Sequence, residues 1–433
     1  MDLLVVGGGV AGMAAAAHAA ARGARVTVVE KTAKLGGSGA VSAGIVWTAP
    51  DDATFRRVCP DGDPDLGRTL VDGFDSAVER AREAGVPVSE RWTGQMGFGV
   101  AHRVEMRALL ERWQETVEAC GGRIEFGASA RELLRDEDGG VRGARVATAG
   151  TGATGTEVAA AAVLLATGGF QGDPALVRAA IGPGAEHMPV RSHPGATGDG
   201  LRMARAAGAA HASGPGDGFY GHLVPSPLGR WRQDEFLALT QYHSQQGVLV
   251  NRDGRRFAEE WRGDEVSNQS ALRQPGSRAV LLFDERVRLE HAVAAPYPHG
   301  QVADRLALAE EVGARVAHAP TLRRLIAHVA GWDVDGDGLT ATLAMRPDPL
   351  REPPFHALEV QPSITFTYGG VRADADGRVL DSEGRPLPGL FAAGADVGGL
   401  QGPGYVGGLA LGLVFGPRAA EAALERSASH AGS

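Results

Sequence analysis

The sequence predicts an α/β protein in which one domain, built on a parallel sheet with covering helices, is interrupted by a second domain. A strand–turn–helix–strand order at the N-terminus predicts the sheet. Near residue 213 the alanine-rich sequence gives way to aromatic residues, histidines, glycines and prolines, which predicts the interruption. An apolar strand and glycine-rich turn from Gly389 predict the return to the first domain. We expect boundaries at 1–212, 213–352 and 353–433.

The N-terminal segment contains the elements of a doubly wound, Rossmann-like fold. Residues 3–6 form a short apolar run before a group of glycines, and residues 11–21 are rich in alanine and favour a helix. A second apolar run at 25–29 ends in Glu30. This order predicts the first βαβ unit of a parallel sheet.

Further elements follow from local alternation and turn residues. Strands at 123–126, 130–135 and 141–148 predict a small meander, and residues 160–166 predict an apolar strand. In the second domain, residues 247–250 predict a strand and residues 306–329 predict helical structure.

Composition excludes several classes of protein. The net charge is -9, and no strip rich in lysine and arginine is available for a nucleic-acid backbone. The two cysteines, Cys59 and Cys120, lack the CxxC spacing of a redox-active disulfide. No apolar run is long enough to span a membrane, and the N-terminal run lacks the positive leading region of a signal peptide. We therefore expect a cytoplasmic protein without nucleic-acid or membrane partners.

The glycine pattern Gly7-x-Gly9-x-x-Gly12 predicts a dinucleotide-binding turn. The first glycine permits the turn, the second lets the backbone approach a pyrophosphate, and the third lets helix and strand pack closely. Glu30 ends the next strand, where its carboxylate can bind ribose hydroxyls and repel a 2′-phosphate. The pattern alone does not distinguish NAD from FAD.

No metal site is predicted. The acidic stretch at 333–338 superficially resembles a calcium loop, but Ala344 occupies the position that requires a bidentate glutamate. No group of histidines and cysteines has the spacing of metal ligands.

Further motifs resemble those of the fumarate reductase/succinate dehydrogenase flavoprotein superfamily, which includes tricarballylate dehydrogenase and the 3-ketosteroid dehydrogenases. The motifs span almost the whole chain and lie at 36–38, 166–170, 196–200, 368–370, 389–396 and 407–408. The resemblance implies an FAD-binding domain interrupted by an α+β capping domain, with the substrate held between the cap and the isoalloxazine ring. It also implies hydride transfer between flavin N5 and a carbon of an activated C–C bond.

The resemblance, together with the glycine pattern, supplies the expected cofactor contacts. They are Gly7, Gly9, Val10, Ala11, Gly12, Glu30, Lys31, Gly36, Gly37, Ser38, Ser42, Gly44, Ala130, Thr167, Gly168, Gly169, Asp199, Gly394, Asp396, Gly408 and Leu409. Family members with covalent FAD carry a histidine just after the second glycine pair, where this chain has Ser38 and Ser42. We therefore expect non-covalent FAD.

The chain departs from the family at two substrate-binding positions. Phe366 stands where fumarate reductases have a histidine and ketosteroid dehydrogenases a tyrosine, so that contact is missing or moved to Tyr368. Tyr405 stands where dicarboxylate reductases have a carboxylate-binding arginine. These departures argue against fumarate or succinate and favour a ketone, a monoacid or a larger substrate.

The expected catalytic candidates are His222, Tyr368, Tyr405, Arg262 and Asp264. For the histidine, the alternatives are a substrate ligand or acid and a loop residue satisfied by backbone. The tyrosines either contact flavin or substrate, or only pack beside glycines. The arginine and aspartate belong to a charged run that is also typical of a solvated loop. Neither aligns with the family's proton donor without ambiguity, so the route of the proton stays open.

A further histidine, His243, is a weaker candidate for lining the site. The sequence therefore predicts an FAD-dependent enzyme that desaturates or reduces a C–C bond α,β to a carbonyl or carboxyl group of a small molecule. The alternatives are a flavin-dependent oxidase or hydroxylase, and an FAD-binding protein that has lost catalysis. The substrate, the electron acceptor or donor, the direction of turnover and the oligomeric state do not follow from the sequence.

Overall fold

The computed structural model divides into two compact units. It describes residues 1–212, 218–232, 235–345 and 350–431. The first unit comprises Met1–Ile181, Ser192–Gly218 and Phe366–Ser433, and the second comprises Gly182–Arg191 and Phe219–Thr365. The second unit thus ends later than the expected residue 352, because the strand at Phe355–Gln361 pairs with strands of the inserted unit. It also includes a short segment, 182–191, which lies before the expected start at 213.

The first unit is built on a six-stranded sheet with the order β20-β21-β10-β1-β2-β6. The strands are β1 (Leu3–Val6), β2 (Val26–Glu30), β6 (Arg123–Phe126), β10 (Ala162–Leu165), β20 (Arg378–Leu380) and β21 (Pro386–Ala392). All neighbours are parallel except β20 and β21. The four residues of β1 are fully buried between neighbours on both sides, as expected for the centre of a parallel sheet.

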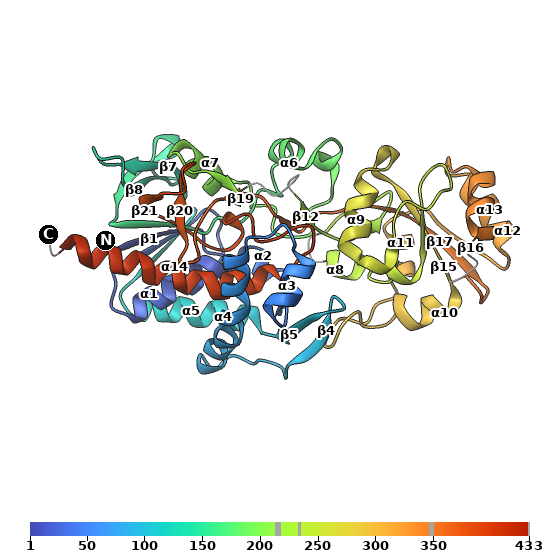
Figure 1. The fold of residues 1–433 in the computed structure, drawn as a ribbon, viewed down its shortest axis with the longest axis horizontal. Coiled ribbons are helices and arrows are strands. Elements are labelled where there is room, and N and C mark those ends of the chain that lie inside the picture. Colours follow the sequence, from blue (N-terminus) through green and yellow to red (C-terminus); the bar gives the residue numbers. More distant parts are fainter. Residues whose placement is uncertain (213–217, 233–234, 346–349, 432–433) are drawn as a thin grey trace. The chain divides into compact units, whose positions relative to one another are not determined.

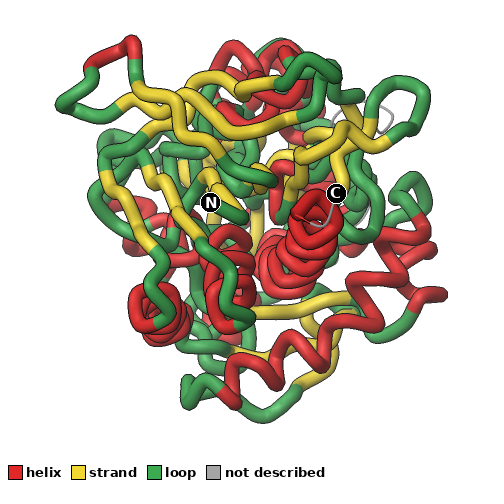
Figure 2. Tube along the Cα trace, turned by 90° about the vertical axis from the view of Figure 1, so that its left-hand side faces the viewer, coloured by secondary structure: helices red, strands yellow, loops and turns green. Residues whose placement is uncertain are grey.

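Three helices pack against strands of this sheet: α1 (Val10–Ala21), α5 (Met106–Ala119) and α14 (Gly408–Ala431) (Figure 1). The α1 and α14 backbones approach closely because small residues meet there. A Cβ at Gly416 would lie 2.5 Å from Ala11 O. Figure 2 shows the end of α14 near the N-terminus, where the Ser427 hydroxyl donates a hydrogen bond to Asp2 O at 3.4 Å.

Two antiparallel three-stranded sheets complete the first unit. One has the order β3 (Ile45–Thr48), β5 (Gly99–Arg103), β4 (Trp92–Gln95), and the other β7 (Ser129–Arg135), β8 (Val141–Ala147), β9 (Thr156–Ala159). The prediction that residues 123–126 belong to the meander is wrong. They form β6, which pairs in parallel with β2, because a parallel partner distant in sequence leaves no local signal.

The second unit contains a five-stranded antiparallel sheet. Four of its strands have the order β13-β17-β15-β14, and β16 also pairs with β17. The strands are β13 (Val224–Pro225), β14 (Val248–Val250), β15 (Ala279–Asp284), β16 (Val316–Ala319) and β17 (Phe355–Gln361). Alternate residues of β15 enter two different cores: Val280 and Leu282 join one, and Leu281 and Phe283 the other. The expected helical stretch 306–329 is interrupted by β16, whose hydrogen bonds with β17 override the helical pattern.

The remaining elements are shorter or lie at the periphery of these layers. The helices are α2 (Gly37–Ala40), α3 (Asp52–Val58), α4 (Pro64–Glu83), α6 (Pro174–Ile181), α7 (Asp199–Ala206), α8 (Phe236–Leu239), α9 (Asp264–Leu272), α10 (Glu285–Val287), α11 (Arg305–Glu311), α12 (Leu322–Ala330) and α13 (Gly336–Met345). The short strands are β11 (His211–Ala212), β12 (Phe219–Tyr220), β18 (Phe366–Thr367) and β19 (Gly370–Val371). In the part of the chain that is described, no helix has the length and apolarity required to cross a membrane.

Candidate functional site

The glycine turn between β1 and α1 has the geometry that a dinucleotide requires. Gly7 has a φ of 108°, and a Cβ there would lie 2.3 Å from Ala166 O. A Cβ at Gly12 would lie 2.0 Å from Gly7 O, so helix and turn can meet only without a side chain. Both positions are thus restricted to glycine by the fold itself.

Gly9 differs because the space in front of it is open. It precedes the first residue of α1, has an extended conformation, and an added Cβ would meet nothing within 4 Å. No side chain caps α1, and its first turn carries no acidic residue. The first amides of a helix have no partner within the helix and carry partial positive charge. The turn therefore fits the pyrophosphate of FAD.

Glu30 is held at the end of β2 by the backbone. Its Oε2 accepts a hydrogen bond from Gly8 N at 2.8 Å, and its Oε1 accepts one from Thr32 N at 2.7 Å. The residue is 9% exposed. Each carboxylate oxygen can accept a second hydrogen bond, so this geometry leaves acceptor sites for ribose hydroxyls, and ribose binding stays a prediction.

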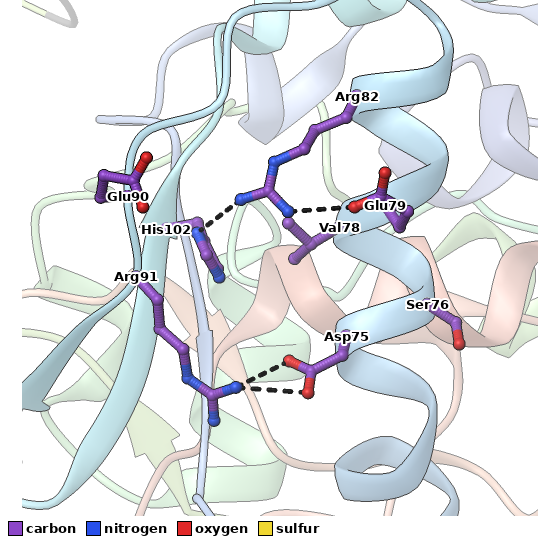
Figure 3. Close-up of a pocket in the computed structure, with 8 residues that line it drawn as sticks. All are labelled: Asp75, Ser76, Val78, Glu79, Arg82, Glu90, Arg91 and His102. Atoms are coloured by element: carbon purple, nitrogen blue, oxygen red, sulfur yellow. Dashed lines mark hydrogen bonds and ion pairs between the residues drawn. The ribbon is translucent and has the colours of Figure 1, made fainter.

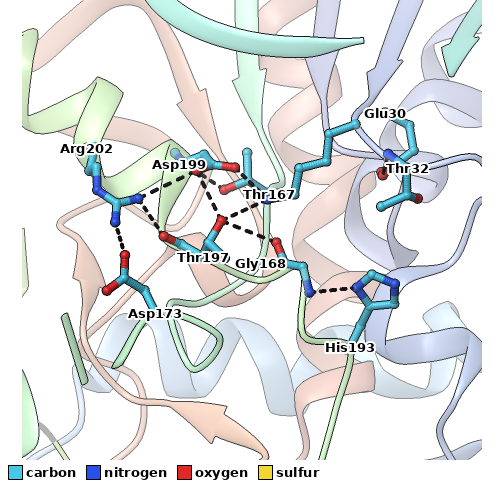
Figure 4. Close-up of polar contacts among 12 residues, drawn as sticks. Glu30, Thr32, Thr167, Gly168, Asp173, His193, Thr197, Asp199 and Arg202 are labelled. Carbon is cyan, nitrogen blue, oxygen red and sulfur yellow. Dashed lines mark hydrogen bonds and ion pairs between the residues drawn. The ribbon is translucent and has the colours of Figure 1, made fainter. Parts of the chain in front are cut away.

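A charged network next to Glu30 joins β2 to the start of α7 (Figure 4). Lys31 Nζ lies 2.6 Å from Asp199 Oδ2 and donates to Thr197 Oγ1 at 2.8 Å. Arg202 donates to Thr197 O at 2.6 Å and pairs with Asp173. The structure thus brings together two predicted contacts, Lys31 and Asp199, that are far apart in sequence.

A second network links Asp396 to the turn after β10. Asp396 accepts hydrogen bonds from the Thr167 amide, from Thr167 Oγ1 at 2.9 Å and from Gly168 N at 3.1 Å. Gly200 N donates to Thr167 Oγ1 at 2.9 Å. Burial raises the pKa of Asp396 to about 7, although the hydrogen bonds from Thr167 and Gly168 oppose this shift. Asp396 therefore fixes the predicted contacts Thr167 and Gly168.

This shift predicts how stability depends on pH. The unfolded carboxyl titrates near its ordinary pKa of about 4, so between about pH 4 and 7 the folded protein holds a proton that the unfolded chain releases. The contribution of Asp396 to stability is therefore lost as pH rises through this window. We expect the melting temperature of D396N apoprotein to fall less between pH 5 and 8 than that of the wild type. Parallel pH profiles in a thermal melt would contradict the raised pKa.

The other predicted cofactor contacts also belong to the first unit. The Ser38 hydroxyl accepts a hydrogen bond from His193 N at 3.3 Å, and Gly394 has a φ of 69°, with an added Cβ 2.8 Å from Ala11 Cβ. Val10 and Ala11 lie in the first turn of α1, and the remaining residues are Gly36, Gly37, Ser42, Gly44, Ala130, Gly169, Gly408 and Leu409. Their contact with FAD stays a prediction.

Tyr405 belongs to an aromatic group of the first unit. Its ring centroid lies 5.6 Å from that of Phe366 and 6.4 Å from that of Tyr368, with the two tyrosine rings stacked. Its hydroxyl oxygen accepts a hydrogen bond from Gly408 N at 2.6 Å, at the first residue of α14. Tyr405 thus caps the helix that follows it, a role that the sequence does not indicate.

This cap predicts a stability effect. Y405F keeps the ring but removes the acceptor of the Gly408 amide. We expect the free energy of unfolding to fall by about 0.5–2 kcal/mol, as for the loss of other N-terminal caps. Chemical denaturation measures this change, and an unchanged midpoint and slope would contradict the cap.

In the second unit, the partly exposed Tyr220 and three buried side chains form a polar chain. Tyr220 Oη lies 2.7 Å from His222 Nε2, and His222 Nδ1 lies 3.3 Å from Asp264 Oδ2. The Ser244 hydroxyl donates to Asp264 Oδ1 at 2.7 Å. His222 is 2% exposed, and burial, reinforced by the charge of Arg191, lowers its pKa. A neutral imidazole between a phenol and a carboxylate can accept and pass on a proton.

Arg262 makes no hydrogen bond or ion pair with the polar chain formed by Tyr220, His222, Asp264 and Ser244. Its side chain is 57% exposed and pairs with Glu259 at 3.4 Å, as expected for a solvated loop. His243 is buried against Phe283, and burial lowers its pKa to about 3. Neither of its ring nitrogens has a hydrogen-bond partner among the described residues. These facts favour a packing role for His243.

Several polar residues near these groups are not among the residues predicted from the sequence. Thr197 could have been found, because it lies inside the motif at 196–200. Ser244 and Arg191 carry no local signal, since their roles depend on partners far along the chain. Arg191 is one of the most buried charged residues of the second unit, with 3% exposure.

A separate pocket lies between α4 and the strands β4 and β5 of the first unit (Figure 3). Four of its charged side chains are paired within the protein: Arg91 with Asp75 at 3.1 Å, and Arg82 with Glu79 at 3.1 Å. It therefore offers little unsatisfied chemistry to a ligand. No group of three potential metal ligands occurs within the described residues.

Comparisons with known proteins cover nearly the whole chain. The model of the FAD binding domain family matches residues 2–410. The NADH:fumarate oxidoreductase of Klebsiella pneumoniae is 28% identical over 459 residues, which cover 98% of this chain but 48% of that protein. The chain therefore spans about half the length of this relative.

Two further comparisons cover most of both chains. A fumarate reductase (cytochrome) of Shewanella frigidimarina is 29% identical over 472 residues, covering 99% of this chain and 77% of that protein. The crystal structure of 3-ketosteroid-Δ4-(5α)-dehydrogenase from Rhodococcus jostii RHA1, in complex with 4-androstene-3,17-dione, superposes with a TM-score of 0.76 at 22% identity, covering 98% of this chain and 96% of that chain. The expected α/β fold with an inserted unit is confirmed.

Proposed function

This chain belongs to the FAD binding domain family, within the fumarate reductase/succinate dehydrogenase flavoproteins, and from that premise we propose that it reduces or desaturates a C–C bond α,β to a carbonyl or carboxyl group. Its cofactor is FAD, which we propose is bound non-covalently. Bound FAD supplies hydride exchange at N5, while the protein must bind the substrate, polarise it and move one proton.

The observation that carries this proposal is the polar chain Tyr220–His222–Asp264, in which His222 and Asp264 are buried and Tyr220 is partly exposed. The 2.7 Å contact between Tyr220 Oη and His222 Nε2 places a phenol against a neutral imidazole. The Asp264 carboxylate lies 3.3 Å from Nδ1 without hydrogen-bond geometry, and its charge favours the tautomer with a proton on Nδ1, which leaves Nε2 as an acceptor for the phenol. Tyr220 is thus the proposed proton donor in reduction and acceptor in desaturation.

The proposal is tested with chemically reduced holoenzyme under anaerobic conditions. We would mix it with α,β-unsaturated ketones and acids and with isomers whose double bond is out of conjugation. Saturation of conjugated probes alone, detected by mass spectrometry, is the expected result, because only these carry an activated double bond. If no probe is saturated and oxygen alone reoxidises the holoenzyme, an oxidase or hydroxylase replaces the proposal.

A further inference from the structure

The second unit holds a buried guanidinium without a carboxylate partner. Arg191 is 3% exposed, and its Nε and Nη2 donate to Thr240 Oγ1 at 3.1 and 2.8 Å. Its Nη1 donates to Thr365 Oγ1 at 2.6 Å, and the group lies over the Phe236 ring, 5.2 Å from the centroid. All these partners are neutral. Buried charges are normally paired, because transfer of an unpaired charge from water is costly.

Three arginines of this unit that are more exposed do have carboxylate partners. Arg256 pairs with Glu260 at 2.5 Å, and Arg278 and Arg315 both pair with Glu359 at 3.1 Å. Within the described residues, Arg191 makes no such pair. Among the buried arginines of this unit, Arg191 and Arg305 both lack a carboxylate partner within the described residues, and they differ in what replaces it.

A second buried cation, Arg305, adds to the positive charge. It is 1% exposed and lies over the Tyr242 ring, whose neighbours are His222 and Tyr297. Its hydrogen bonds go to the backbone carbonyls of 292, 294, 301 and 303. These hydrogen bonds give Arg305 a structural role, because they hold the loop at 292–303 in place. Within the described residues, the Arg191 side chain donates to no backbone carbonyl, so it does not order a loop in the way that Arg305 does.

The nearby acids do not balance this charge. Asp264 faces His222, and burial raises the pKa of its neighbour Glu265 to about 7, so Glu265 is only partly charged at neutral pH. A guanidinium has five N–H groups, of which the two threonines take three. The remaining N–H groups are one on each terminal nitrogen, and both can donate to a carboxylate.

We propose that Arg191, supported by Thr240 and Thr365, binds the carboxylate of an α,β-unsaturated or saturated monocarboxylic acid substrate. This inference rests on the proposed function and specifies its substrate class. Tyr405 stands where dicarboxylate reductases have a carboxylate-binding arginine, and our proposal places the anion site at a different position. Arg191 also lies close enough to His222 to lower its pKa, which connects the anion site to the proposed proton chain.

The test compares acids with neutral analogues of the same chain. Acrylate, crotonate and trans-cinnamate are each titrated into oxidised holoenzyme by calorimetry, beside the corresponding methyl ketones. We expect at least one acid to bind the wild type, and R191Q to weaken it by about 10- to 100-fold, the value of a charge-assisted hydrogen-bonded pair. The ketones should change by less than about twofold, since they lack the charge. R323Q removes an exposed arginine of the same unit and is the matched control.

Two further measurements test the inference even if R191Q does not fold: acid binding by R191K, and bromide binding in crystals of the wild type. R191K retains the charge without the planar fork and should bind with intermediate affinity. In bromide-soaked crystals of the wild type, an anomalous peak should lie against the terminal nitrogens of Arg191. Unchanged acid binding in R191Q, binding of no acid by the wild type, or the absence of the bromide peak would each overturn the inference. Turnover of conjugated ketones would then still support the proposed function, whereas acid binding without any turnover would support the anion site alone.

Discussion

Replacement of His222 by glutamine is expected to lower kcat for conjugated probes by about 10²- to 10⁴-fold, the usual contribution of general acid–base catalysis. Glutamine can hydrogen-bond to Tyr220 but cannot exchange a proton as imidazole does. FAD content should be unchanged, because His222 and the glycine turn belong to different units. Steady-state kinetics of wild type and H222Q at saturating probe measures this loss.

H243Q provides the matched control for this prediction. His243 is also a buried histidine of the second unit, but it packs against Phe283 and has no hydrogen-bond partner among the described residues. We expect its kcat to stay within about tenfold of the wild type. Equal losses in H222Q and H243Q would show that packing rather than proton transfer causes the effect. A wild-type rate in H222Q would remove the polar chain from the mechanism.

Replacement of Gly9 by alanine is expected to weaken FAD binding by about 10- to 100-fold while leaving the apoprotein as stable as the wild type. The conformation of Gly9 is open to any residue, and an added Cβ meets nothing within 4 Å. The methyl group would therefore affect only the space in which the pyrophosphate is expected. FAD titration and thermal melts of the apoprotein measure the two effects separately.

Two further glycine variants make this result specific. G12A should destabilise the apoprotein, because its Cβ would lie 2.0 Å from Gly7 O. G150A should affect neither property, since the nearest atom to its Cβ is 3.9 Å away. FAD binding by G9A with wild-type affinity would contradict the placement of the cofactor at α1.

Local sequence was sufficient to predict the first βαβ unit. Gly7, Gly9 and Gly12 lie close together in sequence, and Glu30 ends the adjacent strand, so their spacing alone predicts a dinucleotide-binding turn. The contact between Asp396 and Thr167 joins residues far apart in sequence and was accessible only through the family resemblance. The confirmed fold therefore rested on short-range pattern and family motif together.

The rest depended on tertiary partners. The pairing of β6 with β2 is parallel and distant, so alternation along 123–126 could not reveal it. Arg262 lies in a charged loop beside the family-like segment, yet only the structure shows that its side chain faces solvent. Arg191 is informative because no carboxylate pairs with it in the described part of the chain, a property that no sequence pattern displays.

The central claim, an FAD enzyme acting on C–C bonds next to a carbonyl or carboxyl group, is tested most directly by one absorption experiment. The spectrum of purified protein is recorded before and after acid precipitation, and again during anaerobic mixing with saturated ketones and acids, followed by their unsaturated counterparts. Our account predicts a yellow protein that releases FAD into the supernatant and whose flavin is bleached by a saturated probe or, once reduced, reoxidised by an unsaturated one. A colourless protein that FAD does not reconstitute, or a flavin that no probe bleaches or reoxidises, would contradict it.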